Sequence, residues 1–272
     1  MEEVQLRLVM DLLQLCVKRA STAVSRMRFS LSNPTERHSV ILLLALIDHG
    51  RSILALLIAK EYPGIPIIGR AAVEGYVDLV NLCDNRRYWM HLEADEVTRW
   101  TEYEQLARTG ANRNLQPIVR FPRIDELRRY YARRRQELGR LDIGVLSIAA
   151  KFERAGLREM YDSYYALLCS ETHNGAPNLL SRYVAMDQDT MRARAPGERN
   201  RSQHHYEAPV ALTTSEIIVR ATERVLQLCG HGTAAMHEAR ERLDHVSRLC
   251  LTEEELRAGQ TGDPADAESA GF

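Results

Sequence analysis

The sequence predicts an all-α protein: a single multi-helix bundle of about eight or nine helices with a disordered C-terminal tail. Apolar residues recur at steps of three and four over most of the 272 residues, the period of an α-helix. Proline and glycine separate these periodic segments. A hydrophobic content of 45% can fill one sizeable core. We therefore expect one helical bundle domain over residues 1–252, followed by a tail of small and polar residues over 253–272.

Punctuating residues set the expected helix boundaries. Ser32 and Asn33 precede Pro34 as a cap before a first-turn proline, and Asn174-Gly175 is a helix stop. Residues 187–207 carry no helical period and are expected to form a mobile loop or a weak hairpin, with no other strand in the chain. The expected helices span residues 2–27, 34–61, 66–83, 86–108, 124–138, 141–155, 158–172, 176–186, 209–229 and 234–251.

Charge and cysteine usage exclude several classes of protein. The formal net charge is −1, so no global field draws the molecule to nucleic acid or to an acidic membrane. The five cysteines are far apart, which favours buried thiols in a reducing compartment over disulfides or zinc. The N-terminus lacks a basic signal-peptide region. We expect a cytoplasmic protein, with no cofactor-binding fingerprint and no metal site.

The most apolar segment runs from Val40 to Ala59 and carries Asp48 and Arg51 near its middle. Each ionised group would cost roughly 2.5–3.5 kcal/mol at the centre of a membrane span. The segment is therefore predicted to be a central buried helix of a soluble bundle, with no membrane involved. Asp48 and Arg51, three residues apart, are expected to pair with each other or with polar residues of the next helix as an ion network.

The following helix, from Ile67 to Cys83, is apolar on nearly every side except one narrow line. Arg70, Glu74, Asp78 and Asn81 follow one another at steps of four, four and three and share one face. Such a line borders either solvent or an internal polar site. Gly75 costs about 1 kcal/mol relative to Ala in mid-helix, which predicts close approach of another element.

A second group of polar residues lies on the segment Met160–Gly175. Tyr165, Cys169 and His173 follow one another at steps of four, and Ser170 lies nearby. A histidine beside a carboxylate and an arginine can transfer protons near neutral pH. The alternative is that His173 only satisfies carbonyls in the last turn of its helix.

Two further features remain open. Arg199, followed by Asn200, and His204 resemble the Arg-polar-x3-His signature of the HEPN superfamily of helical ribonucleases, although chance alone predicts several such pairs in an arginine-rich chain. The arginine-dense segment 120–140, which carries Tyr130 and Tyr131, could lie along a phosphate backbone or form a solvated helix.

Across residues 35–185 the chain resembles a bacterial family of helical proteins known only as a domain of unknown function, family five-six-seven-seven. The segments GRAAVEGYVDLVNL and MYDSYYALLCSETHNG carry this resemblance, and the positions that match are Arg70, Glu74, Tyr164 or Tyr165, Ser170 and His173. Gly69 replaces the serine usual before the arginine. The resemblance implies a HEPN-like fold and a link to phage defence or stress response, by analogy of fold.

These observations suggest a metal-independent ribonuclease with RNA as its partner. Arg70 would bind an anionic group, Glu74 would orient it, and His173 would be the acid–base, with Arg199 and His204 as the alternative pair. Asp48, Arg51, Asp78, Tyr165 and Ser170 are expected to support the site. The rival hypothesis is a non-catalytic interaction module, a homodimer formed through the apolar helices.

Overall fold

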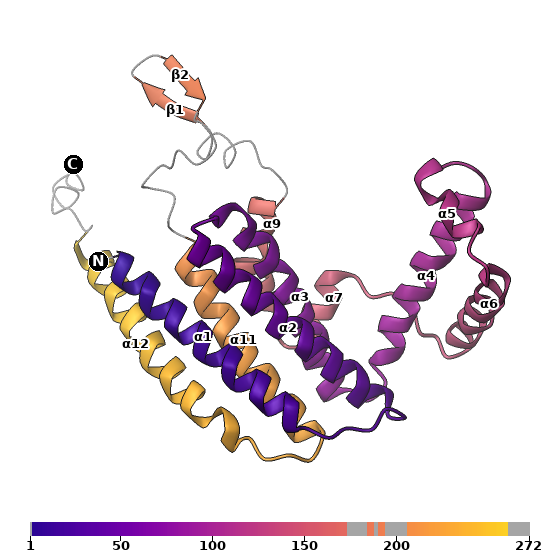
Figure 1. Ribbon diagram of the computed structural model, residues 1–272, viewed down its shortest axis with the longest axis horizontal. Helices are drawn as coiled ribbons and strands as arrows, with labels where there is room; N and C mark the ends of the chain where they lie inside the picture. Colours follow the sequence, from indigo (N-terminus) through magenta and orange to yellow (C-terminus); the bar gives the residue numbers. More distant parts are fainter. Residues whose placement is uncertain (1, 173–183, 188–189, 194–205, 261–272) are drawn as a thin grey trace, which may run out of the picture. The chain divides into compact units, whose positions relative to one another are not determined.

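Helices make up nearly all of the computed structural model, which describes residues 2–172, 184–187, 190–193 and 206–260 (Figure 1). The longer helices are α1 (Glu2–Arg26), α2 (Pro34–Ala59), α3 (Ile65–Asp84), α4 (Trp89–Arg108), α6 (Ile124–Arg140), α7 (Ile148–Arg154), α9 (Ala166–Thr172), α11 (Glu207–Leu228) and α12 (His237–Gln260). Short helical turns are η1 (Tyr62–Gly64), η2 (Arg113–Leu115), α5 (Gln116–Val119), α8 (Arg158–Met160) and η5 (Ala234–Met236). The predicted all-α fold class is confirmed.

Most predicted helix boundaries agree with the structure within three residues, and three segments differ. The helix expected over 141–155 begins only at Ile148, because Asp142 adopts a left-handed φ of 55° and the Ser147 side chain caps α7. Of the helix expected over 176–186, residues 184–186 belong instead to a strand. The hairpin pairs β1 (Val184–Asp187) antiparallel with β2 (Thr190–Ala193). Helix α12 continues to Gln260, into the expected tail, while residues 261–272 lie outside the described part.

The chain divides into two compact units, and two of the boundaries between them fall inside α2 and α3. The first unit contains Met1–Arg28, Leu42–Tyr76 and Ser163–Phe272, and the second contains Phe29–Ile41 and Val77–Asp162. The prediction of one bundle domain over residues 1–252 stays a prediction, since the helices α2 and α3 contribute to both units.

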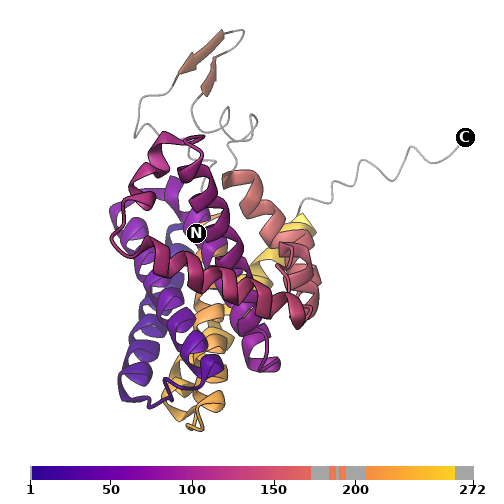
Figure 2. The ribbon, with the colours of Figure 1, turned by 90° about the vertical axis from the view of Figure 1, so that its right-hand side faces the viewer.

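In the first unit, α1 lies alongside α11 and α12 (Figures 1 and 2). Its apolar face, which includes Leu12, Leu13 and Cys16, is fully buried. Burial raises the pKa of the Cys16 thiol to about 12, so this thiol stays protonated. The other four cysteines are only partly buried, which corrects the expectation of five buried thiols.

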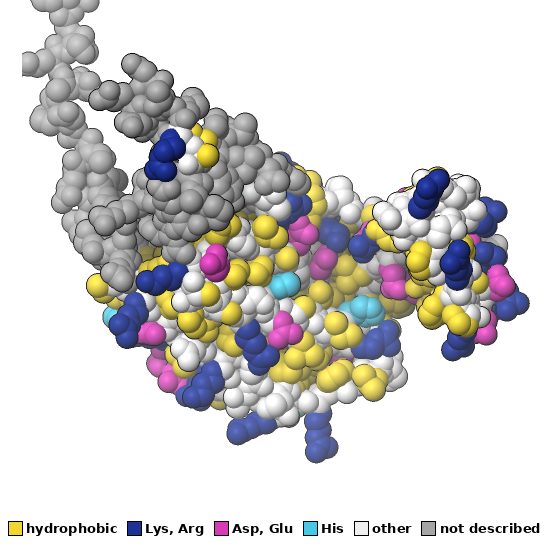
Figure 3. All heavy atoms as spheres, turned by 45° about the horizontal axis from the view of Figure 1, so that its top comes forward, with side chains coloured by type: hydrophobic (Ala, Val, Ile, Leu, Met, Phe, Trp, Pro, Cys, Tyr) yellow, Lys and Arg dark blue, Asp and Glu magenta, His cyan; other side chains and the backbone are white. Residues whose placement is uncertain are grey.

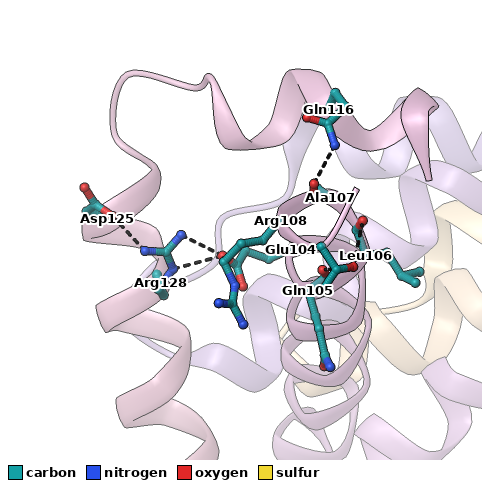
Figure 4. Close-up of polar contacts among 9 residues, drawn as sticks. Glu104, Gln105, Leu106, Ala107, Arg108, Gln116, Asp125 and Arg128 are labelled. Atoms are coloured by element: carbon teal, nitrogen blue, oxygen red, sulfur yellow. Dashed lines mark hydrogen bonds and ion pairs between the residues drawn. The ribbon is translucent and has the colours of Figure 1, made fainter. Parts of the chain in front are cut away.

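In the second unit, α4 and α6 pack through a small apolar cluster of Ala94, Val97 and Leu138. Charged residues surround this contact. Glu104 of α4 is buried and accepts hydrogen bonds from Arg128 of α6, which also pairs with Asp125 (Figure 4). Arg134 of α6 likewise binds Glu93 of α4. The arginines of α6 that pair in this way hold the two helices together.

Helix α2 is less buried than the sequence predicted. Among the described residues it is the one helix with the length and hydropathy of a membrane span, a test that core helices of soluble proteins also pass. Only 33% of its most apolar window is buried. One face packs inside the first unit, and the other leaves large apolar side chains exposed, including Leu44 and Ile58. The expectation of a central buried helix is therefore wrong, because the segment is apolar on both faces and only one is covered.

Glycines mark the closest helix contacts of the first unit. A Cβ atom at Gly50 of α2 would lie 2.5 Å from Ile218 of α11 and 3.0 Å from Val17 of α1. At Gly69 of α3 it would lie 2.7 Å from Val210 of α11. A Cβ at Gly75 would lie 3.3 Å from Leu46, which confirms the close approach predicted there.

Replacing Gly50 by Ala should destabilise the protein by about 1–3 kcal/mol, because overpacking against Ile218 and Val17 outweighs the roughly 1 kcal/mol gain in helix propensity. Gly139→Ala in α6 is the matched control: its Cβ would meet no atom within 4 Å, so the free energy of unfolding should rise or stay unchanged. Urea unfolding followed by circular dichroism measures both. A Gly50→Ala variant as stable as Gly139→Ala would contradict the close packing of α2.

Candidate functional site

The first half of the polar line on α3 meets a tyrosine from a later part of the chain. Arg70 and Glu74 lie one turn apart, and Arg70 Nε donates a hydrogen bond of 2.9 Å to Glu74 Oε1. The Tyr165 hydroxyl donates to the same oxygen at 2.7 Å. The Arg70 guanidinium also lies over the Tyr165 ring, with 5.5 Å from Cζ to the ring centroid. We call Arg70, Glu74 and Tyr165 the Arg70 cluster.

Tyr165 reaches this position from an irregular helical turn. Residues Tyr161–Tyr165 form a π-helical segment between α8 and α9. A π segment is rare, inserts extra backbone into a helix and often occurs at functional sites. Tyr165, at the end of this segment, is 4% exposed and lies against α3. The local cost of the π turn is offset by a buried ring whose hydroxyl finds an ionised partner.

The electrostatics of the Arg70 cluster keep its cation charged and its phenol neutral. Burial lowers the pKa of Arg70, but the bond to Glu74 and the nearby Tyr165 outweigh this effect and raise it. Burial, then the carboxylate of Glu74, raises the pKa of Tyr165, which also interacts with Cys169. The side chains of Arg70 and Glu74 remain 25% and 38% exposed. An oriented, water-accessible guanidinium of this kind can bind a phosphate or a carboxylate.

The second half of the polar line belongs to a separate cluster within the second unit. Asp78 accepts a hydrogen bond of 2.5 Å from the Tyr88 hydroxyl and pairs with Lys151 Nζ at 3.1 Å. Asn81 is buried and donates to the backbone oxygens of Val77 and Lys151. The side chains of Asp78 and Lys151 are both 16% exposed. These contacts satisfy buried polar groups, and they indicate a structural role for this cluster.

Asp48 and Arg51 of α2 pair with each other, as one of the two sequence alternatives predicted. Arg51 Nη1 lies 3.1 Å from Asp48 Oδ1, and Arg51 Nη2 donates to Ser21 of α1 at 3.0 Å. The side chains of Arg51 and Asp48 are 57% and 70% exposed. The pair is therefore not the buried ion network that the apolar surroundings suggested. Their role in supporting a catalytic site stays a prediction.

His173, the acid–base of the first predicted catalytic set, lies outside the described residues. Arg199 and His204, the alternative pair, lie outside them as well. Helix α9 ends at Thr172, directly before His173. Ser170 is exposed on α9, and the contact between Tyr165 and Cys169 agrees with the predicted step of four. Lys151 was missed because it lies far from α3 in the sequence, and Tyr88 was missed because it lies beyond the end of α3, where helical spacing no longer predicts contacts. The one available signal was that Lys151 is one of only three lysines in the chain.

The arginine-dense helix α6 has a largely structural explanation. Tyr131 stacks on Trp100 of α4 with ring centroids 5.1 Å apart and donates to Glu96. Burial and the bond to Glu96 raise the pKa of Tyr131 to about 12. Arg128 and Arg134 pair with acidic residues of α4. This agrees with the solvated-helix interpretation on one side of α6, while Arg129 and Arg133 on the other side are exposed.

In the part of the chain that the structure describes, no group of three or more His, Cys, Asp or Glu residues could hold a metal ion. The fold and the Arg70 cluster define an all-helical protein with an anion-accessible polar cluster on α3. Residues 37–191, more than half of the chain, match the model of a family of unknown function, DUF5677, and the chain belongs to this family. Comparison with curated proteins and with solved structures finds no match.

Replacing Asp78 by Ala should destabilise the protein by about 3 kcal/mol, since it removes two buried contacts and leaves the Lys151 ammonium without its carboxylate. Asp162→Ala is the control. It breaks an exposed pair with Arg158, with side chains 54% and 57% exposed, and should leave the melting temperature nearly unchanged. Thermal unfolding of both variants measures the difference, and equal effects would contradict the structural role of Asp78.

Tyr165→Phe should cost about 1.5–3 kcal/mol, because it removes a hydrogen bond to a charged carboxylate while keeping the ring on Arg70. The pKa of Tyr165 is raised, so the phenol is protonated at pH 6 and at pH 9. The hydrogen bond therefore contributes fully at both values and is lost only as the pH rises through the raised pKa. Urea unfolding of wild type and variant at pH 6 and 9 tests this. A difference that changes between these two values would show that the hydroxyl is not held as described.

Proposed function

We propose that this protein is a cytoplasmic, bacterial, metal-independent ribonuclease with HEPN-like chemistry, acting in phage defence or stress response. The single observation that supports this most strongly is the Arg70 cluster. It holds a partly exposed guanidinium in a defined orientation through Glu74 and Tyr165. An exposed ion pair alone contributes little stability, and a guanidinium held in a fixed orientation is suited to bidentate recognition of a phosphate.

In this proposal Arg70 binds the phosphate of the scissile bond. The ribose 2′-hydroxyl attacks the phosphorus and loses its proton to water, and the bond from phosphorus to the 5′ oxygen breaks. His173 donates a proton to that departing oxygen. The products are a 2′,3′-cyclic phosphate and a 5′-hydroxyl. Glu74 orients Arg70, and preorganised charge of this type can lower a barrier without a metal.

The chain position of His173 supports its assignment. Tyr165 and Cys169 lie one helical turn apart and interact, and His173 is four residues further along. It follows directly after the end of α9, whose first residues adjoin the Arg70 cluster. Ser170 supports this end of α9 in the proposal, and Arg199 with His204 is the alternative catalytic pair.

The test is an RNA-cleavage assay with purified protein in EDTA. Wild type should cleave a single-stranded RNA to cyclic-phosphate ends, and Arg70→Ala and His173→Ala should each lose about 100-fold or more in rate. His204→Ala tests the alternative pair in parallel. The control Arg220→Ala removes an exposed helical ion pair with Glu216 on α11 and should leave the rate unchanged.

Melting temperatures measured on the same samples separate a site from a structural network. If Arg70→Ala only lowers the melting temperature, the cluster is structural. If wild type cleaves no RNA, the ribonuclease proposal fails, and a non-catalytic interaction module becomes the better explanation. Retained cleavage by His173→Ala with loss in His204→Ala would transfer the acid–base role to the second pair.

A further inference from the structure

The exposed face of α2 has an unusual order of side chains. The inward residues of this helix, such as Leu43, Gly50 and Leu57, are buried. On the opposite side one row of exposed residues follows alternating steps of three and four, the spacing of the a and d positions of a coiled coil. They are Ile41, Leu44, Asp48, Arg51, Ala55 and Ile58, which we call the outer seam of α2.

The outer seam is apolar at both ends and charged in the middle. Ile41, Leu44 and Ile58 are 57%, 45% and 65% exposed, large values for apolar side chains at helical spacing in one row. Asp48 and Arg51, at the centre, are exposed by 70% and 57%. In the part of the chain that the structure describes, the side chains of this row are exposed, whereas those of the inward face are buried. The space-filling view shows hydrophobic side chains lying among charged ones on the face that it presents (Figure 3).

The order of apolar and charged positions along the seam is the same when it is read from either end, with the opposite charges exchanged. Ile41 corresponds to Ile58, Leu44 to Ala55, and Asp48 to Arg51. Two copies of α2 placed antiparallel about a two-fold axis would therefore bring apolar residues opposite apolar ones. Asp48 of each copy would lie opposite Arg51 of the other. An interface between identical chains must be self-complementary in this way.

We propose that the outer seam of α2 binds a second copy of this chain, forming an antiparallel two-helix interface with a central charged layer. The apolar layers at the two ends supply the driving force by removing Ile41, Leu44 and Ile58 from water. The central layer fixes register and orientation, as polar residues at a and d positions do in coiled coils. Asp48 and Arg51 already pair within each chain, and the second copy extends these two pairs into a ring of four charges.

The charges favour a second copy over a membrane as the occupant. A lipid tail offers no partner to Asp48 or Arg51, and both lie midway between the apolar ends of the seam. A second copy supplies one opposite charge for each. The two occupants also predict different results for charge variants. Mixing two variants of opposite charge can restore binding between two copies of the chain, but it cannot restore binding to a membrane.

A charge-exchange experiment on the full chain tests the proposal by sedimentation velocity over a range of concentrations. Wild type should form a dimer. Asp48→Arg makes the central layer wholly positive and Arg51→Asp makes it wholly negative, so each variant alone should dimerise at least about tenfold more weakly. An equimolar mixture of the two variants should recover the dimer, because each arginine again faces an aspartate. The control substitution Arg220→Glu changes an exposed charge on α11. The protein that carries it should dimerise as strongly as wild type.

Three results would overturn the proposal. The first is a wild type that stays monomeric at every concentration tested, and the second is a mixture that fails to recover a dimer that both single variants lose. Flotation of monomeric wild type with phosphatidylcholine vesicles would assign the seam to a membrane instead. Circular dichroism melting of each variant serves as the folding control, and we expect the fold to be retained because both positions are exposed. Ile58→Asp is a second variant at the apolar end of the seam, and it should weaken the dimer without rescue by either charge variant.

Discussion

The polar line along α3 is the constraint on which much of this structure depends. A helix that is apolar on its other sides must be covered on those sides, and its polar groups must still be satisfied where they are buried. The structure meets both requirements at once. Gly69 and Gly75 allow α11 and α2 to approach closely. The tyrosines and the lysine that other segments contribute then satisfy the carboxylates of the line.

The two clusters along this line differ in access to water, and that difference separates structure from candidate function. Asp78 and Lys151 are enclosed, so their charges neutralise each other and stabilise the second unit. Arg70 and Glu74 are more open, and the Tyr165 ring beneath the guanidinium fixes the orientation of the cation. A charge that is oriented and still reaches solvent can bind a ligand. For this reason the proposed ribonuclease site is assigned to the Arg70 cluster.

Helix α2 shows why hydropathy alone does not reveal which side of a helix is buried. Its inward face carries Gly50, which lets α1 and α11 approach closely, and its outer seam exposes three large apolar side chains around a charged pair. A helix that is covered on one face needs apolar residues only on that face, and α2 carries more apolar residues than this. Self-association would bury the remainder, and the exchange symmetry of Asp48 and Arg51 would then determine the orientation of the partner.

The sequence by itself determined the helices, since a period of 3.6 residues is a local property, and it also determined that Arg70, Glu74, Asp78 and Asn81 share a face. It gave the self-pairing of Asp48 and Arg51 as one of two alternatives, and it predicted the close approach at Gly75. Only the tertiary structure decided that Tyr165 binds Glu74, that Lys151 and Tyr88 bind Asp78, and that one face of α2 is exposed. These contacts join different segments of the chain, and their choice depends on packing and on a π-helical turn that no local pattern encodes.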